Sequence, residues 1–166
     1  MNNYFKLLGI EQNYAINLDL LDRQYFAMQL KYHPDKRGDI SEKNFNLAIS
    51  IDLNKAYSVL KDDLARAEHL LMLNNVSLDE LAARQSIPQS QLKIIWDELE
   101  LVENIAELAK LQDILDDKID EQKDLIVLLT TAFQNHNIQD ALETAVMLKY
   151  LKTLINNIQL RIKACK

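Results

Sequence analysis

Hydrophobic residues recur every three or four positions along most of the chain, which is the spacing of one face of an α-helix. Residues 3–8 are largely apolar and precede Gly9, the residue best suited to close a helix in a left-handed conformation. A second stripe begins after Asn17, which can cap a helix, and stops near Tyr32 because Pro34 follows. A third stripe consists of Phe45, Ile49, Leu53, Ala56 and Leu60. The pattern therefore predicts one short helix and two long ones.

The two predicted long helices are separated by a loop of about ten residues, so their simplest packing is an antiparallel hairpin with the loop at one end. We expect the short helix to close this hairpin together with Ala67, Leu70 and Leu71. The helical pattern weakens between residues 74 and 90. We therefore predict an N-terminal domain over residues 1–74 and a connecting segment over residues 75–88.

The remainder of the chain carries three further helical patterns. The first predicts a helix over residues 91–109, with a stripe of Leu92, Ile95, Leu99, Val102, Ala106 and Ala109. Two more helices are predicted over residues 111–133 and 138–162, with a turn at Asn135-His136-Asn137. Three helices joined by short links form an up-down-up bundle, here over residues 89–166. The whole chain is therefore predicted to be all-α.

Composition supports this fold class and limits the partners. The 166 residues include only two glycines and two prolines, too few for the turns that many strands require. The formal charge of −6 argues against nucleic-acid binding, which needs clustered Lys and Arg. No stretch approaches the ~20 apolar residues of a membrane span, and the N-terminus has no targeting pattern. We therefore expect a cytoplasmic protein with neither nucleic acid nor membrane as a partner.

Cysteine use limits the chemistry in a similar way. Cys165 is the single cysteine, so an intrachain disulfide, a thiol-rich metal site and a bound iron–sulfur cluster are not expected. The chain also lacks a glycine-rich phosphate-binding loop. The sequence thus predicts no metal and no cofactor. Fifteen of the 25 acidic residues lie beyond residue 73, which makes the C-terminal half a candidate binding surface.

The predicted hairpin loop begins with His33-Pro34-Asp35. A rigid proline between two polar side chains at an exposed helix end is suited to docking a partner. The tripeptide by itself also fits a plain helix stop, in which Pro34 breaks the helix and Asp35 makes a local turn. A metal site is poorly supported, because His69 and His136 lie in other predicted elements.

Three motifs, taken in order, resemble a J domain. They are Tyr4-Phe5-Lys6-Leu7-Leu8-Gly9-Ile10, Leu30-Lys31-Tyr32-His33-Pro34-Asp35-Lys36 and Asn54-Lys55-Ala56-Tyr57. The resemblance implies docking on the ATPase domain of a DnaK-type chaperone, where His33, Pro34 and Asp35 would stimulate ATP hydrolysis. The expected basic contributors, unless they are ordinary surface charges, are Arg23, Lys31, Lys36 and Arg37. Many J domains carry basic residues where this chain has Phe26 and Ala27, so the electrostatic attraction to the chaperone is expected to be weaker.

A second candidate site lies on the first helix of the predicted bundle. Beside its core stripe runs a second stripe of Trp96, Glu100, Glu103 and Glu107. An exposed aromatic residue among carboxylates is typical of a binding patch. On the last helix Met147, Tyr150 and Leu154 form an extra apolar row, and Tyr150 would extend the patch. The pattern also allows a buried Trp96, a solvated acidic face and a Tyr150 packed between helices.

The order of the motifs resembles the HscB family, a group of J-domain co-chaperones of iron–sulfur cluster assembly. The resemblance rests on the N-terminal J domain, the segment Arg66-Ala67-Glu68-His69-Leu70-Leu71 and the acidic helix Leu99-Glu100-Leu101-Val102-Glu103. It implies that the bundle binds the iron–sulfur cluster scaffold protein through Ile95, Trp96, Leu99, Glu100, Glu103, Glu107 and Tyr150. Relatives often have a proline at Asp63 and an aromatic residue at His69. Eukaryotic members can carry a cysteine-rich segment ahead of the J domain, so its absence favours a bacterial form.

The resulting interpretation is an adaptor and not an enzyme, with no catalytic residues of its own. It would stimulate an HscA-like, DnaK-type chaperone ATPase and deliver the scaffold protein to it. The main alternative is a general J-protein that hands over unfolded chains, which would be expected to show a Gly/Phe-rich linker or zinc-binding cysteines. A helical hydrolase that used His33, Asp35 and the C-terminal carboxylates would need groups from separate domains in one pocket.

Overall fold

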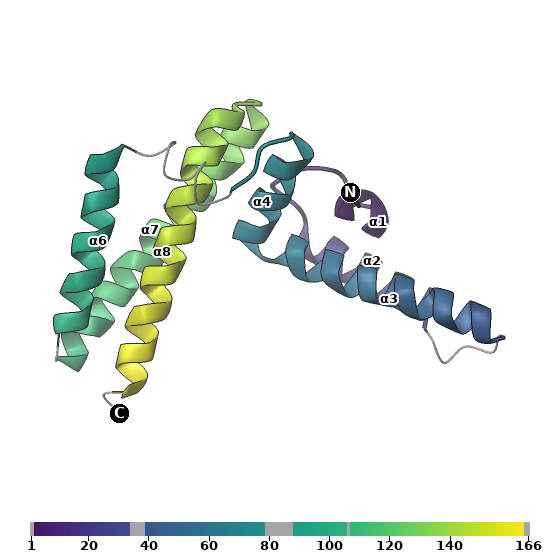
Figure 1. The fold of residues 1–166 in the computed structure, drawn as a ribbon, viewed down its shortest axis with the longest axis horizontal. Helices are drawn as coiled ribbons and strands as arrows, with labels where there is room; N and C mark the ends of the chain where they lie inside the picture. The colour runs from purple at the N-terminus through teal and green to yellow at the C-terminus, as the bar shows by residue number, and fades with distance from the viewer. Residues whose placement is uncertain (1, 34–38, 79–87, 106, 165–166) are drawn as a thin grey trace. The chain divides into compact units, whose positions relative to one another are not determined.

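The computed structural model describes residues 2–33, 39–78, 88–105 and 107–164. Every regular element in these residues is an α-helix, as the sequence pattern predicts. The chain divides into two compact units, Met1–Leu73 and Asn74–Lys166, each of which is described below by itself (Figure 1). The predicted connecting segment 75–88 lies largely outside the described residues, so its structure stays a prediction.

The described residues of the first unit form the helices α1 (Tyr4–Leu8), α2 (Leu18–Lys31), α3 (Ile40–Lys61) and α4 (Asp63–Leu73). The predicted helix ends at Asn17 and Gly9 are confirmed, and the structure adds a cap at Asn3. The side chains of Asn3 and Asn17 accept hydrogen bonds from the first turns of α1 and α2, and Gly9 closes α1 with a φ of 65°. The helix α2 ends at Lys31, ahead of Pro34, as expected.

The core of the first unit lies at one end of the α2/α3 hairpin, where α1 and α4 cover it. The buried apolar residues are Phe5, Leu8, Tyr14, Leu21, Leu53, Ala56, Leu60, Ala67, Leu70 and Leu71. Ala67, Leu70 and Leu71 therefore close the hairpin as predicted. Phe45 was expected to continue the buried stripe, but 62% of its surface is exposed. The reason is that the helices which cover the core do not extend to the loop end of the hairpin.

A buried arginine ties the start of α4 to the rest of the first unit. Arg66 donates hydrogen bonds from Nε to the Tyr14 carbonyl over 2.8 Å and from Nη1 to the Leu60 carbonyl over 2.6 Å. Its Nη2 bonds Asp63, and its guanidinium lies 4.9 Å from the centre of the Tyr14 ring. One side chain thus joins the α3–α4 junction to the Tyr14 segment, which lies 52 residues away in sequence.

The buried His69 connects α4 to α1. Its Nε2 accepts a hydrogen bond from the Tyr4 backbone N–H over 3.2 Å, and its ring stacks on the Tyr4 ring with the centroids 4.4 Å apart. Burial lowers the pKa of His69, because the charged imidazolium would lose its hydration. A neutral ring is also required by the accepted hydrogen bond, so this histidine is a structural group of the first unit.

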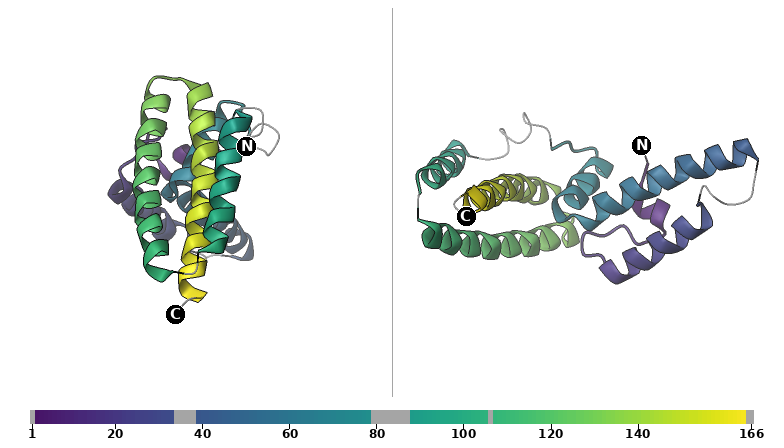
Figure 2. Two further views of the ribbon diagram at one scale, coloured as in Figure 1. Left: turned by 90° about the vertical axis from the view of Figure 1, so that its left-hand side faces the viewer. Right: turned by 90° about the horizontal axis from the view of Figure 1, so that it is seen from below.

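The second unit contains α6 (Gln89–Asn104), α7 (Leu108–Gln134) and α8 (Ile138–Ala164). The three helices run side by side as a bundle with short connections, as predicted (Figures 1 and 2). The turn between α7 and α8 includes His136, which has a φ of 55°. One predicted boundary is wrong: the first helix ends at Asn104 and not at residue 109, because Ile105 adopts an extended conformation and α7 begins at Leu108.

The core of the second unit is built mainly on α8. Its buried residues are Ala141, Leu142, Ala145, Val146, Leu148, Leu151, Leu154, Ile155, Ile158 and Ile162. Leu154 was assigned to a second, outer row, and this is wrong, because it packs with Val102 of α6 and Leu111 of α7 in one hydrophobic cluster. Among the described residues, none of the helices is long and apolar enough to cross a membrane.

Candidate functional site

The first candidate site begins where α2 ends. Tyr32 closes the helix with a backbone hydrogen bond from its N–H to the Met28 carbonyl over 3.0 Å, and the exposed His33 follows directly. Lys31 is exposed as well, with its ammonium 5.1 Å from the centre of the Tyr32 ring. Pro34, Asp35, Lys36 and Arg37 lie outside the described residues, so their predicted roles stay predictions.

Polar side chains join α2 to α3 along the half of the hairpin that lacks a hydrophobic core. Asn54 Oδ1 accepts hydrogen bonds from the Tyr25 hydroxyl over 2.7 Å and from the Gln29 amide over 2.6 Å. Gln29 in turn accepts a hydrogen bond from the Ser50 hydroxyl over 2.8 Å. We call Tyr25, Gln29, Ser50 and Asn54 the hairpin ladder. It fixes the register of the two helices, and hence where α2 presents His33.

A second set of contacts continues the connection toward α4. The Tyr57 hydroxyl donates a hydrogen bond to Asp22 over 2.9 Å, and the Tyr57 ring stacks on the Tyr25 ring with the centroids 4.1 Å apart. Lys61 lies 3.5 Å from the same carboxylate of Asp22. These directional contacts hold one hairpin register, whereas apolar contacts alone would tolerate small shifts.

The outer face of α2 carries apolar residues between its basic ones. Phe26 is 62% exposed and Leu30 is 73% exposed, while Arg23 and Lys31 are exposed on the same helix. Phe26 and Ala27, which stand where many J domains have basic residues, therefore both lie on the surface of α2. Any partner of this face would meet apolar area flanked by two positive charges.

The second candidate site lies on α6. Trp96 is 64% exposed, and Glu100 and Glu103 are exposed four and seven residues further along. Spacings of four and three residues place these side chains on one side of the helix. Trp96 therefore does not enter the bundle core, whereas Ile95 is buried and Leu99 packs against the buried cluster. The predicted division of α6 into a core stripe and an outer stripe is confirmed for these residues.

Glu107 does not continue this stripe. It is the N-terminal capping residue of α7, with an extended backbone, and its exposed carboxylate belongs to the next helix. The sequence pattern treated residues 91–109 as one helix, and the break at Ile105 removes the expected alignment. Of the predicted acidic residues, Glu100 and Glu103 therefore share the face of Trp96.

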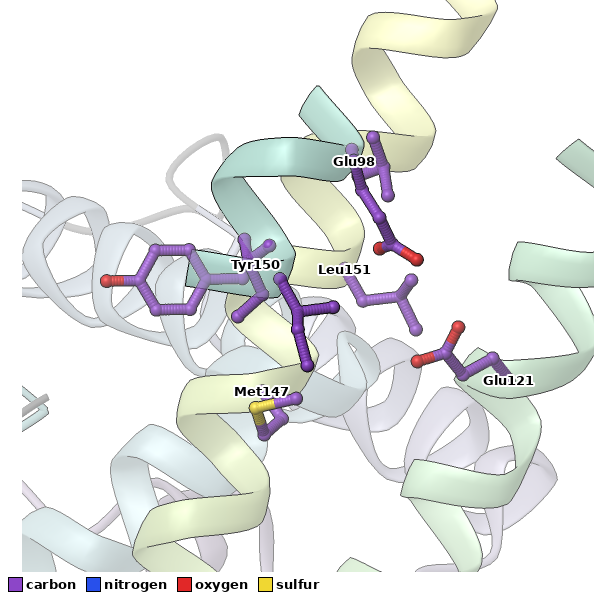
Figure 3. Close-up of a pocket in the computed structure, with 8 residues that line it drawn as sticks. Glu98, Glu121, Met147, Tyr150 and Leu151 are labelled. Atoms are coloured by element: carbon purple, nitrogen blue, oxygen red, sulfur yellow. The ribbon is translucent and has the colours of Figure 1, made fainter. Parts of the chain in front are cut away.

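Tyr150 is half-buried and lies at a pocket between α6 and α8 with a volume of about 230 Å³. The pocket is lined by Ile94, Ile95, Glu98, Glu121, Met147, Tyr150, Leu151 and Leu154. Figure 3 shows Tyr150 and Met147 on one side and the carboxylates of Glu98 and Glu121 on the other, with Leu151 between them. The pocket therefore combines an apolar wall with an acidic end, contributed by all three helices of the bundle.

A lysine joins the two carboxylates at the acidic end. The Nζ atom of Lys118 lies 2.7 Å from Glu98 Oε1 on α6 and 2.9 Å from Glu121 Oε2 on α7. Burial lowers the pKa of Lys118, but the hydrogen bonds and charges of Glu121 and Glu98 outweigh it and raise the pKa above its usual value. The ammonium is therefore charged at neutral pH and connects α6 to α7. No cluster of three or more His, Cys, Asp or Glu in the described residues is placed to hold a metal ion.

Comparison with known proteins agrees with these two units and their order. The DnaJ domain family matches residues 3–69, and the family described as the HSCB C-terminal oligomerisation domain matches residues 95–159. Over 113 residues the chain is 33% identical to the co-chaperone protein HscB homolog of Vibrio cholerae serotype O1 strain M66-2. The chain belongs to the HscB family of J-domain co-chaperones.

The alignment with this HscB relative covers 67% of the present chain and 64% of the relative. The chain thus matches a little under two thirds of the relative's length. A solved structure of chaperone HscB from Vibrio cholerae has 26% identity and a TM-score of 0.82, over 95% of this chain and 96% of that chain. Human co-chaperone protein HscB shares the fold, with 23% identity and a TM-score of 0.88 over 96% of this chain and 82% of that chain.

Several residues that contribute to the two candidate sites were not predicted from the sequence. Asn54 and Tyr57 were noted only as parts of a motif, and Gln29, Ser50 and Lys118 were not noted as site residues. For Gln29 and Ser50, polar residues at half-buried positions of α2 and α3, the available signal was that such groups need partners. Gln29 is 25 residues from Asn54 and 21 from Ser50, and Lys118 is 20 residues from Glu98, so only the fold shows which residues are partners.

Proposed function

We propose that this protein is a co-chaperone which stimulates the ATPase of a DnaK-type, HscA-like chaperone and delivers the iron–sulfur cluster scaffold protein to it. It would act in the cytoplasm of a bacterium and aid the maturation of iron–sulfur proteins. The proposal is supported by a J domain and an HscB-type C-terminal domain in one chain. The observation that carries it is the exposed Trp96 with Glu100 and Glu103 on α6, in a chain whose J domain presents His33 at the end of α2.

In the proposed mechanism the protein is an adaptor, and the chaperone performs the hydrolysis. The end of α2, with His33, Pro34 and Asp35, docks on the ATPase domain, supported by Arg23, Lys31, Lys36 and Arg37. The bundle holds the scaffold protein at the same time. Binding of both partners makes their encounter effectively intramolecular, so two weak contacts produce a strong combined effect.

The scaffold-docking face of the proposal consists of Ile95, Trp96, Leu99, Glu100, Glu103 and Tyr150, with Glu107 as a more distant contributor from α7. Trp96 supplies an aromatic anchor of the kind that dominates protein interfaces. Glu100 and Glu103 would attract a basic patch on the scaffold and select its orientation. Ile95 and Leu99 hold α6 on the core and thereby support the anchor.

The test measures ATP hydrolysis by a DnaK-type chaperone with this protein, with the scaffold protein, and with both. We expect each alone to stimulate weakly and both together to act synergistically. The His33→Gln variant should lose stimulation with and without scaffold, while keeping its affinity for the scaffold. Stimulation that is indifferent to the scaffold would instead support a general J-protein with unfolded clients.

A second set of variants tests the bundle face. The Trp96→Ala, Glu100→Gln, Glu103→Gln triple variant should lose the synergy and keep the stimulation seen without scaffold. A matched control is the Asp116→Asn, Asp124→Asn variant, which removes two exposed carboxylates from α7. If the triple variant bound the scaffold as tightly as the control, the proposed face would be wrong.

A further inference from the structure

The proposed scaffold-docking face is assembled from two helices. Trp96, Glu100 and Glu103 belong to α6, whereas Tyr150 belongs to α8. The relative position of α6 therefore decides whether the aromatic anchor, the carboxylates and Tyr150 form one surface. Residues that hold α6 in place influence binding even though they need not touch the partner.

The helix α6 is fastened at few points. Among the α6 side chains whose burial is described, those of Ile95 and Val102 are buried, and the N-terminus has no side-chain hydrogen bond at the capping position, Pro88. At its C-terminal end Arg161 of α8 donates a hydrogen bond to the Ile105 carbonyl over 2.8 Å. Near the level of Trp96 an ion bridge from Glu98 to Lys118 joins α6 to α7.

Lys118 is well placed to control this part of α6. Its side chain is only 16% exposed, although its ammonium lies at hydrogen-bonding distance from carboxylates on two helices. Two carboxylates that share one cation repel each other when the cation is removed, and because Glu98 is 37% exposed and Glu121 is 46% exposed, water screens part of this repulsion. Without Lys118, Glu98 and Glu121 would therefore push α6 away from α7.

We propose that Lys118 is a positioning residue for scaffold binding: by bridging Glu98 and Glu121 it holds α6 where Trp96, Glu100 and Tyr150 form one docking face. The inference rests on the proposed function and deepens it, because it assigns the geometry of the scaffold site to a residue outside that site. Glu98 is two residues from Trp96 and two from Glu100, so a displacement of Glu98 displaces both.

The central experiment compares Lys118→Met with Lys118→Arg and Lys123→Met. Methionine keeps the length and apolar stem of the lysine but removes its charge, and arginine keeps the charge. Lys123 is the matched control, because it is an exposed lysine of α7 whose ion pair with Asp120 stays within one helix. Scaffold is titrated into each variant in the chaperone ATPase assay. The fluorescence of Trp96, the single tryptophan, reports the surroundings of α6 without any partner.

We expect Lys118→Met to raise the scaffold concentration for half-maximal synergy about fivefold, the size of coupling usual for residues in one ionic network. Maximal synergy and stimulation without scaffold should stay at the wild-type level. The Trp96 emission should shift in Lys118→Met only. Lys118→Arg should keep the wild-type half-maximal scaffold concentration and the wild-type Trp96 emission. A variant that was simply less stable would also lose maximal synergy and stimulation without scaffold.

A charge-neutral background tests the physical cause. In a Glu98→Gln, Glu121→Gln protein the repulsion is absent, so adding Lys118→Met should change scaffold binding by less than in the wild type. If Lys118→Met proves poorly folded, Glu98→Gln alone removes the partner on α6 and should still weaken scaffold binding. Unchanged half-maximal concentration and unchanged Trp96 emission in both would overturn the inference. A wild-type protein that shows no scaffold synergy would instead overturn the proposed function.

Discussion

The two units of this protein hold their exposed faces by different means. In the bundle, buried residues recur along α8 from Ala141 to Ile162. The helix that carries Tyr150 therefore packs on a hydrophobic core along nearly its whole length. In the hairpin, α2 has one buried residue, Leu21, and the buried residues of α3 are Leu53, Ala56 and Leu60. The face near His33 therefore depends on hydrogen bonds between polar side chains, whereas the face near Trp96 depends on apolar packing and one ion bridge.

The chemistry of the two faces differs as well. The α6 face combines an aromatic residue with Glu100 and Glu103, whereas the α2 face exposes Phe26 and Leu30 between positive charges. Opposite charge at the two faces would help to direct each partner to its own site. A helix can thus be positioned either by a hydrophobic core or by a network of polar side chains, and the two arrangements respond differently to mutation.

The largest expected effect would come from the bundle core. Leu154→Ala should lower the free energy of unfolding of the second unit by about 3 kcal/mol, because it leaves a cavity in the cluster that joins α6, α7 and α8. Urea unfolding followed by Trp96 fluorescence measures this change. Leu160→Ala, on the exposed side of the same helix, is the control and should have little effect. Equal midpoints for the two variants would show that α6 does not depend on this core.

A smaller effect is expected in the hairpin ladder. Asn54→Ala removes the acceptor shared by Tyr25 and Gln29 and should cost about 1 kcal/mol, since water can partly replace it. Hydrogen exchange of the α2 amides measures the loss, and chaperone stimulation without scaffold should fall at low protein concentration. The neighbouring exposed Lys55→Ala should change neither quantity. If Asn54→Ala behaved like Lys55→Ala, the apolar end of the hairpin would suffice to position α2.

The smallest expected effect is a pH dependence confined to the first unit. Because the pKa of His69 is lowered in the folded protein, its stabilising contribution is complete above the unfolded value of 6.5 and is lost as the pH falls through the folded value. The wild-type first unit should therefore lose more stability between pH 7.5 and pH 5 than a His69→Phe variant, which keeps the stacking on Tyr4. Near-ultraviolet circular dichroism of tyrosine measures this, since five of the six tyrosines lie in the first unit. Parallel pH profiles for the two proteins would assign the dependence to other groups.

Much of the fold was predictable because local signals are strong in this chain. Asn17 and Gly9 mark helix ends through a short-range hydrogen bond and a left-handed backbone conformation, and the structure confirms both. The helices of the bundle follow from apolar spacing, and the exposure of Trp96 follows from its offset of one position from the core stripe. The break at Ile105 escaped prediction because the apolar spacing continues across it.

The all-α class, most of the helix ends, the order of a J domain before a helical bundle and the two candidate faces could be read from the amino-acid sequence. This is possible because capping, periodicity and motif spacing act over a few residues. Only the tertiary structure decided that Phe45 is exposed, that Leu154 is in the core, that Glu107 belongs to α7, and that Lys118 bridges α6 and α7. Each of these depends on which helix lies alongside and how far it extends, and that is a property of packing between segments distant in the chain.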